Sequence, residues 1–280
     1  MFCERGIERS QQYPIVLTIL DWNPALYRRY EDERTRPAQE LLARVPLTDA
    51  TRVVDLGCGP GNSTELLAHR FSTAQVVGTD NSEAMLVSAR ERLPGSTFEL
   101  SDIATWAPRS TREAPDLIYA NASLQWVPDH ATLIPRLFDA LAPGGVLAIQ
   151  MPDNREEPTH RLMRAVATEA PWAEAIGDAD RLRTLLLDVG GYYDLLAPRA
   201  ANVDVWHTIY QHRMADAAAI VEWVRGTGLK PFVDRLSPEL QASYLAEYLR
   251  RVDAAYPARA DGKRLLAFPR LFIVAQKAKA

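Results

Sequence analysis

The sequence has few residues of the kinds that build disulfide frameworks, metal clusters or membrane spans. Only two of its 280 residues are cysteines, Cys3 and Cys58, and only five are histidines. Two thiols so far apart predict no disulfide framework, and no His/Cys/Asp group has the spacing of a metal site. No apolar run approaches the ~18 residues that a membrane span needs, and no secretory leader pattern is recognisable. These shortages favour a cytoplasmic protein that binds neither a membrane nor a metal.

An excess of positive charge is also missing. The chain carries 32 Lys and Arg against 36 Asp and Glu, which gives a net charge of −4, so nothing suggests a nucleic-acid partner. Lysine is scarce, and only Lys230, Lys263, Lys277 and Lys279 occur. Arginine suits bidentate recognition of carboxylates, but its abundance alone identifies no such site. Composition therefore does not identify the small-molecule partner, which only sequence motifs can indicate. The chain is expected to be a monomer.

Residues 1–20 read unlike the rest, because they show no clear periodicity before an abrupt change at Asp21. We expect them to form a flexible or non-native extension. Residues 21–280 are expected to form one domain, with a core at about 45–155 and 200–280. No repeat or linker divides this part of the chain.

From Arg52 the chain alternates between strand and helix patterns. The expected strands are Val53–Leu56, Gln75–Asp80, Thr97–Leu100, Asp116–Ala120, Val146–Met151, Asp204–Tyr210 and Leu271–Ala275. The expected helices are Ala25–Leu42 (broken near Pro37), Thr64–Phe71, Ser82–Leu93, Leu133–Leu141, Thr159–Ala170, Asp180–Asp188, Ala215–Gly226 and Pro238–Ala255. This order predicts an α/β fold, a mostly parallel sheet that binds its ligand at the carboxyl ends of the strands. The helices of residues 215–260 are expected to form a lid insertion.

One loop carries the main chemical signal, Asp55-Leu56-Gly57-Cys58-Gly59-Pro60-Gly61. It joins a buried strand to a helix start, where unpaired N–H groups and close backbone approach suit a ligand. The dinucleotide fingerprint is G-x-G-x-x-G, whereas these glycines are spaced G-x-G-x-G. The spacing and the preceding acid favour a ligand with an ammonium group over a pyrophosphate. Asp80 ends the next strand, where a carboxylate can accept both ribose hydroxyls.

These motifs together resemble the class I S-adenosylmethionine-dependent methyltransferases. The resemblance rests on Val53–Gly61, Asp80, Asp102-Ile103 and Leu141–Gly145, the turn before the fifth strand. It implies a Rossmann-like, seven-stranded sheet whose last strand is antiparallel, and S-adenosyl-L-methionine as the cofactor. It further implies the following cofactor-binding residues: Asp55, Gly57, Gly59 and Asn121 at the methionine moiety, Asp80 at the ribose, and Asn81, Met85, Asp102 and Ile103 at the adenosine.

A narrower resemblance extends over nearly the whole chain from Asp21. Residues 21–27, 120–130 and 266–274 are similar to a subfamily that methylates a carboxylate of a small polycarboxylic acid. An ionised carboxylate needs no general base, so we expect positioning residues and no catalytic one. The candidates for binding the substrate are Trp22, Tyr27 and Tyr30 on an N-terminal flap, Gln125 and Trp126 after the fourth strand, Met151 and Asn154 after the fifth, and Arg264 and Arg270 beside the last.

Three other functions stay open on the sequence. The first is a methyltransferase for another acceptor, such as a different polycarboxylate, a phenol or an amine; the lack of an evident general base weakly favours carboxylates among these. The second is an NAD(P)-dependent oxidoreductase, which the glycine spacing disfavours. The third is a non-catalytic binding protein, disfavoured because Asp55, Gly57, Gly59 and Asp80 are all present.

Overall fold

The computed structural model describes residues 31–279, with side chains from Thr35 onward. The expected N-terminal extension, and the flap residues Trp22, Tyr27 and Tyr30, therefore lie outside the described residues. A search of the described helices finds none long and apolar enough to cross a membrane.

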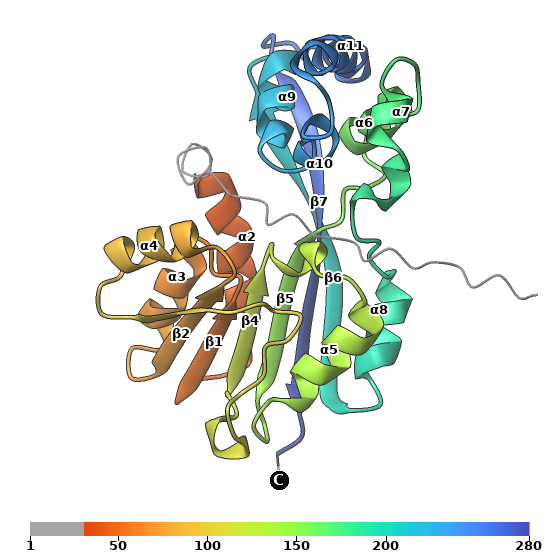
Figure 1. Cartoon of the computed structure of the whole chain (residues 1–280). Coiled ribbons are helices and arrows are strands. Elements are labelled where there is room, and N and C mark those ends of the chain that lie inside the picture. Colours follow the sequence, from red (N-terminus) through yellow and green to blue (C-terminus); the bar gives the residue numbers. More distant parts are fainter. Residues whose placement is uncertain (1–30, 280) are drawn as a thin grey trace, which may run out of the picture.

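A seven-stranded sheet forms the centre of the molecule, in the order β3-β2-β1-β4-β5-β7-β6 (Figure 1). The strands are β1 (Arg52–Leu56), β2 (Gln75–Asp80), β3 (Thr97–Leu100), β4 (Leu117–Asn121), β5 (Val146–Pro152), β6 (Ala200–Met214) and β7 (Arg264–Lys277). The first five strands are parallel, and β7 runs antiparallel to both β5 and β6. The expected mostly parallel sheet with an antiparallel last strand is confirmed.

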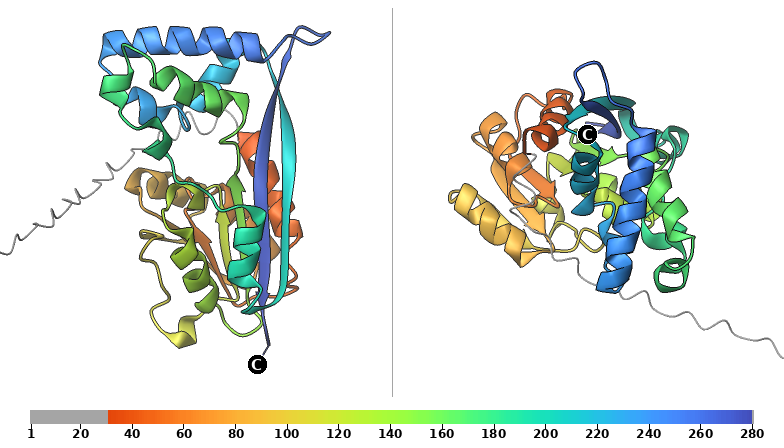
Figure 2. Two further views of the ribbon diagram at one scale, coloured as in Figure 1. Left: turned by 90° about the vertical axis from the view of Figure 1, so that its right-hand side faces the viewer. Right: turned by 90° about the horizontal axis from the view of Figure 1, so that it is seen from above.

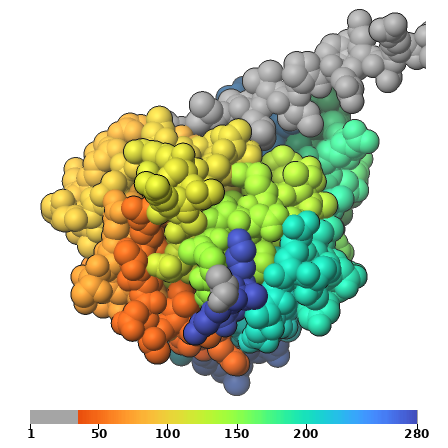
Figure 3. Space-filling model, turned by 90° about the horizontal axis from the view of Figure 1, so that it is seen from below, coloured from red at the N-terminus to blue at the C-terminus, as the bar shows by residue number. Residues whose placement is uncertain are grey.

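Helices cover both faces of the sheet. Side chains alternate along each strand, so successive residues pack against the helices of opposite faces. Helices α2 (Glu31–Ala43) and α3 (Asn62–Arg70) cover the face that carries Val53 and Tyr119. Helices α5 (His130–Asp139) and α8 (Val189–Leu196) cover the face that carries Ile118 and Ile149. Helix α4 (Glu83–Arg92) packs over β2 and β3. Figure 3 shows the molecule from the opposite end, where the C-terminal segment (blue) lies between the N-terminal part of the described chain (orange) and the region near residue 200 (cyan).

A helical cap stands above the carboxyl ends of the strands (Figure 2). Strands β6 and β7 are much longer than the others and continue upward into this cap. Its helices are α6 (Pro158–Ala167), α7 (Ala173–Ile176), α9 (Ala217–Arg225), α10 (Lys230–Val233) and α11 (Pro238–Ala255). They share one apolar core with Met214, Leu266 and Phe268 of the two long strands. The cap therefore includes α6 and α7, which precede β6, in addition to the helices of the expected 215–260 insertion.

Three expectations about secondary structure were wrong. No helix spans Asp180–Asp188: a short 3-10 helix, η3 (Ala179–Leu182), is followed by a linker, and Asp188 caps α8 by accepting from the backbone N–H of Gly191 at 2.7 Å. Three of the linker residues are the leucines Leu185, Leu186 and Leu187, whose high helix propensity favoured the expected helix. Helix α2 does not break at Pro37 but continues through it. Strands β6 and β7 were expected at about half their length.

Candidate functional site

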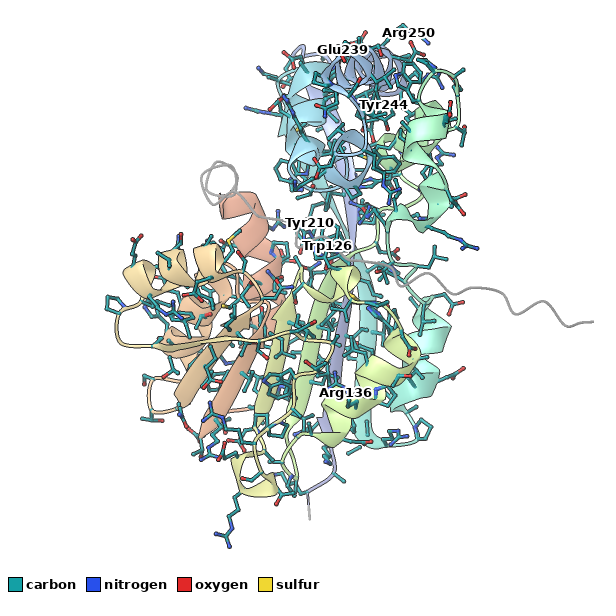
Figure 4. The ribbon with its side chains drawn as sticks, in the orientation of Figure 1. Trp126, Arg136, Tyr210, Glu239, Tyr244 and Arg250 are labelled. Atoms are coloured by element: carbon teal, nitrogen blue, oxygen red, sulfur yellow. The ribbon has the colours of Figure 1, made fainter. Side chains whose placement is uncertain are left out.

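A cavity of about 430 Å³ lies between the carboxyl ends of the strands and the cap. The glycine loop, the ends of β2 to β5 and helix α2 line its lower part, and residues of α6, α9, β7 and the linker before α8 line its upper part. Figure 4 shows Trp126 at this level, where the sheet meets the cap. The cavity therefore joins the motif-bearing end of the sheet to the cap.

The glycine loop is held open toward this cavity by backbone hydrogen bonds. Gly57 and Cys58 both donate their N–H groups to the carbonyl of Thr79, at 2.7 and 2.9 Å. Gly57 has φ +70° and a Cβ there would lie 2.3 Å from the Cβ of Ser123, so only glycine fits. A Cβ on Gly59, at φ +54°, would meet nothing within 4 Å. The backbone of Gly59 is thus open to a ligand on the cavity side.

Asp80 closes the loop from the end of β2. Its carboxylate accepts the N–H of Gly59 through Oδ2 and that of Ser82 through Oδ1, each at 2.9 Å. Burial raises the pKa of this carboxyl, and the backbone donors partly oppose that shift. Asp80 still lines the cavity, as do Asn81 and Met85.

Asp55 does not line the cavity but lies beneath the loop. It is fully buried, and its Oδ2 accepts from the hydroxyls of Ser63 and Thr64, both at 2.7 Å, in the first turn of α3. Its Oδ1 has no hydrogen-bond partner among the described residues. Burial raises the pKa of Asp55 to about 6. Asp55 therefore places a buried carboxyl group close to the loop and off the cavity wall.

The segment after β3 forms the side of the cavity where Asp102 and Ile103 lie. Asp102 accepts the N–H of Ala104 at 2.9 Å through its own side chain. Arg136 on α5 holds the segment from behind by donating to the carbonyls of Ile103, Ala104 and Trp106. No sequence motif marks Arg136 for this supporting role.

The segment after β4 brings Asn121, Gln125 and Trp126 to the cavity. The Oδ1 of Asn121 and the Oε1 of Gln125 are buried without a hydrogen-bond partner among the described residues. Both residues line the cavity, and each has an acceptor oxygen whose hydrogen-bonding capacity the described protein does not use. His130 supports the segment, because its Nε2 bonds the carbonyl of Leu124 at 2.9 Å and its Nδ1 accepts from the hydroxyl of Tyr192 at 2.6 Å.

The cap side of the cavity carries cationic and polar side chains. Arg270 of β7 is buried, donates to the Oε1 of Gln150 at 3.1 Å and lies over the ring of Phe268. Asn154 is buried and accepts from Arg183 at 3.4 Å. Arg183 and His160 also line the cavity. Neither belongs to a sequence motif that would have predicted this position.

Two expected substrate residues lie elsewhere. Met151 is fully buried in the core under α5 and α8. Arg264 pairs with Asp253 at 2.6 Å and donates to backbone carbonyls at the end of α11, so it fastens the cap helix. Neither lines the cavity. Within the described part of the chain, no group of three or more His, Cys, Asp or Glu residues could hold a metal ion.

Comparison with solved structures supports the fold. A phosphoethanolamine N-methyltransferase 2 of Haemonchus contortus, in complex with S-adenosylhomocysteine, aligns at a TM-score of 0.51 and 18% identity. That match covers 87% of this chain and 53% of the other. The YcgJ protein of Bacillus subtilis aligns at a TM-score of 0.54 and 11% identity, over 88% of this chain and 99% of the other. The class I methyltransferase fold is confirmed.

Sequence comparison gives the family. The family described as "Methyltransferase domain" matches residues 47–193. A trans-aconitate 2-methyltransferase of Variovorax paradoxus is 86% identical over 92% of this chain and 99% of its own length. One from Paracidovorax citrulli is 72% identical over 92% of this chain and 98% of its own. The narrower resemblance is confirmed, and the chain belongs to the trans-aconitate 2-methyltransferase family.

Proposed function

We propose that the protein transfers the methyl group of S-adenosyl-L-methionine to one carboxylate of trans-aconitate, giving the monomethyl ester and S-adenosylhomocysteine. The observation that carries this proposal is one cavity joining the glycine loop to a wall that contains arginine. A sulfonium donor and a polyanionic acceptor need such different surroundings within a few ångströms of each other. The names of the curated relatives support the same substrate.

The residues present fit the cofactor. The acceptor oxygen of Asn121 suits the ammonium group of the methionine moiety, and the backbone of Gly57 and Gly59 on the cavity wall is proposed to lie against the same moiety. The carboxylate of Asp80 suits the ribose hydroxyls. The remaining proposed contacts, with the adenosine, are Asn81, Met85, Asp102 and Ile103, which line the same part of the cavity. Asp55 is proposed to act through its buried charge.

When bound, the cofactor supplies a methyl carbon that bonds to a carboxylate oxygen while its bond to sulfur breaks, the electron pair staying on sulfur. No proton leaves the oxygen, so no residue has to act as a base. Negative charge on the carboxylate and positive charge on sulfur cancel, and a cavity that excludes water favours that change. The protein therefore acts by positioning. Gln125, Trp126, Asn154 and Arg270 are the proposed substrate contacts on the described cavity wall. Trp22, Tyr27 and Tyr30 stay predictions.

The enzyme is further proposed to work as a monomer in the cytoplasm. The buried free thiol of Cys58 suits a reducing compartment. Sedimentation analysis of the purified protein tests the monomer.

The function is tested by mass spectrometry of esters formed from trans-aconitate, cis-aconitate, citrate and isocitrate, each with S-adenosylmethionine. We expect a monomethyl ester of trans-aconitate to form fastest. Equal turnover of all four acids would refute the assignment of substrate. Calorimetry provides the cofactor arm: S-adenosylhomocysteine should bind and NADH should not, and the reverse would show a dinucleotide enzyme.

A further inference from the structure

Arg183 is a cation whose charge the described protein does not neutralise. It lies in the linker between η3 and α8 and lines the cavity. Its guanidinium donates to the Oδ1 of Asn154 and lies 5.8 Å from the ring centre of Trp126. No carboxylate within the described part of the chain forms an ion pair with it. A neutral amide and an aromatic face orient this cation but leave its charge uncompensated.

Neighbouring arginines are arranged differently. Arg155 and Arg164 share two carboxylates: each pairs with Asp180, at 2.6 and 3.2 Å, and each also lies beside Glu156. Of these three arginines, Arg183 is the one that lines the cavity. Burial lowers the pKa of His160 on the same wall, and the positive charges of the three arginines lower it further. This end of the cavity is thus electropositive, and a bound anion neutralises its charge.

The chemistry of the reaction decides which carboxylate such a cation binds. The reacting carboxylate loses its negative charge as the ester forms. A guanidinium bound to it would stabilise the substrate more than the transition state and would slow the reaction. A guanidinium on a carboxylate that does not react carries no such penalty, because the charge of that group persists through the step.

We propose that Arg183, oriented by Asn154 and Trp126, binds a carboxylate of the substrate that is not methylated, and so determines specificity for acids with more than one carboxylate. This inference rests on the proposed function. It distinguishes the carboxylate that is methylated from the carboxylate that Arg183 binds. Arg270 supplies a second cation on the cavity wall. Asn154, one of the residues expected from the sequence, thereby acts as a positioning residue.

The test compares the wild type with Arg183→Gln, Arg183→Lys and a control, Arg181→Gln. Arg181 is two residues away, its side chain is 88% exposed and it pairs with Asp178 outside the cavity. Calorimetry measures trans-aconitate binding to protein saturated with S-adenosylhomocysteine. Kinetics compare kcat/KM for trans-aconitate with that for crotonate, a monocarboxylate that lacks the other two carboxylates.

We expect Arg183→Gln to weaken trans-aconitate binding by about 100-fold, as truncation of one partner of a buried charge pair does. Its kcat/KM for crotonate and its affinity for S-adenosylhomocysteine should stay within about 3-fold of wild type. Arg183→Lys should recover part of the binding, and Arg181→Gln should behave as wild type.

Three results would overturn the inference. Unchanged trans-aconitate binding in Arg183→Gln would show that the guanidinium does not contact the substrate. An equal loss for trans-aconitate and crotonate would show a general structural role. If trans-aconitate failed to bind the wild-type complex, the proposed function itself would fall, and the inference with it. A loss confined to Arg183→Gln with normal wild-type activity leaves the function standing.

Discussion

Arg136 and Ile103 connect a helix on one face of the sheet to the floor of the cavity, because the Nη2 of Arg136 donates to the carbonyl of Ile103 at 2.9 Å. The same nitrogen reaches the carbonyl of Ala104 at 3.0 Å. One side chain thus fixes the backbone on which Asp102 and Ile103 reach the cavity. Figure 4 shows Arg136 well below Trp126, outside the cavity.

Arg136→Ala is expected to loosen the segment after β3 without touching a ligand. Charge-assisted hydrogen bonds of this kind contribute about 1.5–3 kcal/mol, so S-adenosylhomocysteine should bind roughly 10-fold more weakly. Calorimetry checks the affinity. Arg109→Ala is the matched control, since Arg109 is 76% exposed and pairs only with Glu99 among the described residues. Equal affinity in both variants would show that the segment is ordered without Arg136.

Tyr192→Phe is expected to release the ring of His130. The hydroxyl of Tyr192 donates to the Nδ1 of His130, which leaves Nε2 protonated to bond Leu124. Removing that hydroxyl should lower the free energy of unfolding by about 1 kcal/mol and raise KM for the acceptor, because Gln125 and Trp126 follow Leu124. Urea unfolding and steady-state kinetics measure the two effects. Tyr193→Phe is the control at a half-exposed neighbour, and an identical change in both variants would contradict this role.

The α/β core could be predicted because its residues interact mainly with sequence neighbours and with the adjoining strands. The run Val53–Leu56 reads as a strand, and Ser82 caps α4 as its position predicts, accepting from Met85 at 3.4 Å. The glycine spacing predicted a ligand loop at Gly57 and Gly59, and in the structure both residues take positive φ and line the cavity. Local sequence patterns were therefore enough to predict the residues on the glycine-loop side of the cavity.

The cavity residues on the cap side could not be predicted from local patterns. Arg264 and Arg270 lie six residues apart on β7, which is about 20 Å along a strand. Which one faces the cavity depends on how far β7 continues into the cap, and no local pattern states that. Arg183 stands in a segment expected to be helical, and its position depends on how the linker before α8 passes over the sheet. Tertiary arrangement decides both cases.

The affinity for S-adenosylhomocysteine is expected to depend on the ionisation of Asp55. Burial raises the pKa of this carboxyl to about 6, so it is mostly neutral at about pH 5 and charged at about pH 7.5. The ammonium group of the ligand favours the charged form, and affinity should therefore rise roughly 10-fold over this range. Calorimetry at several pH values measures the rise.

Asp55→Asn should flatten that pH dependence. An unchanged profile would assign it to another group, of which Asp80 is the nearest candidate because burial raises its pKa as well. The sign for stability is opposite: a raised pKa means that Asp55 stabilises the ligand-free protein below about pH 4 and that this contribution is lost as the pH rises through about 6. Urea unfolding of the ligand-free wild type should show the loss, and Asp55→Asn should remove it.

Gly57→Ala and Gly59→Ala separate the two duties of the glycine loop. At Gly57 a Cβ would lie 2.3 Å from the Cβ of Ser123, so the loop or the segment after β4 must move. The free energy of unfolding should fall by about 2–4 kcal/mol, the combined effect of the clash and positive φ.

At Gly59 a Cβ meets nothing within 4 Å, so the free energy of unfolding should fall by only about 1 kcal/mol, because of backbone strain. The added methyl, however, occupies the face that the ligand must approach. Gly59→Ala should consequently fold well but bind S-adenosylhomocysteine at least 10-fold more weakly, as measured by thermal unfolding and calorimetry. If Gly59→Ala bound like the wild type, the ligand would not approach the loop at that residue.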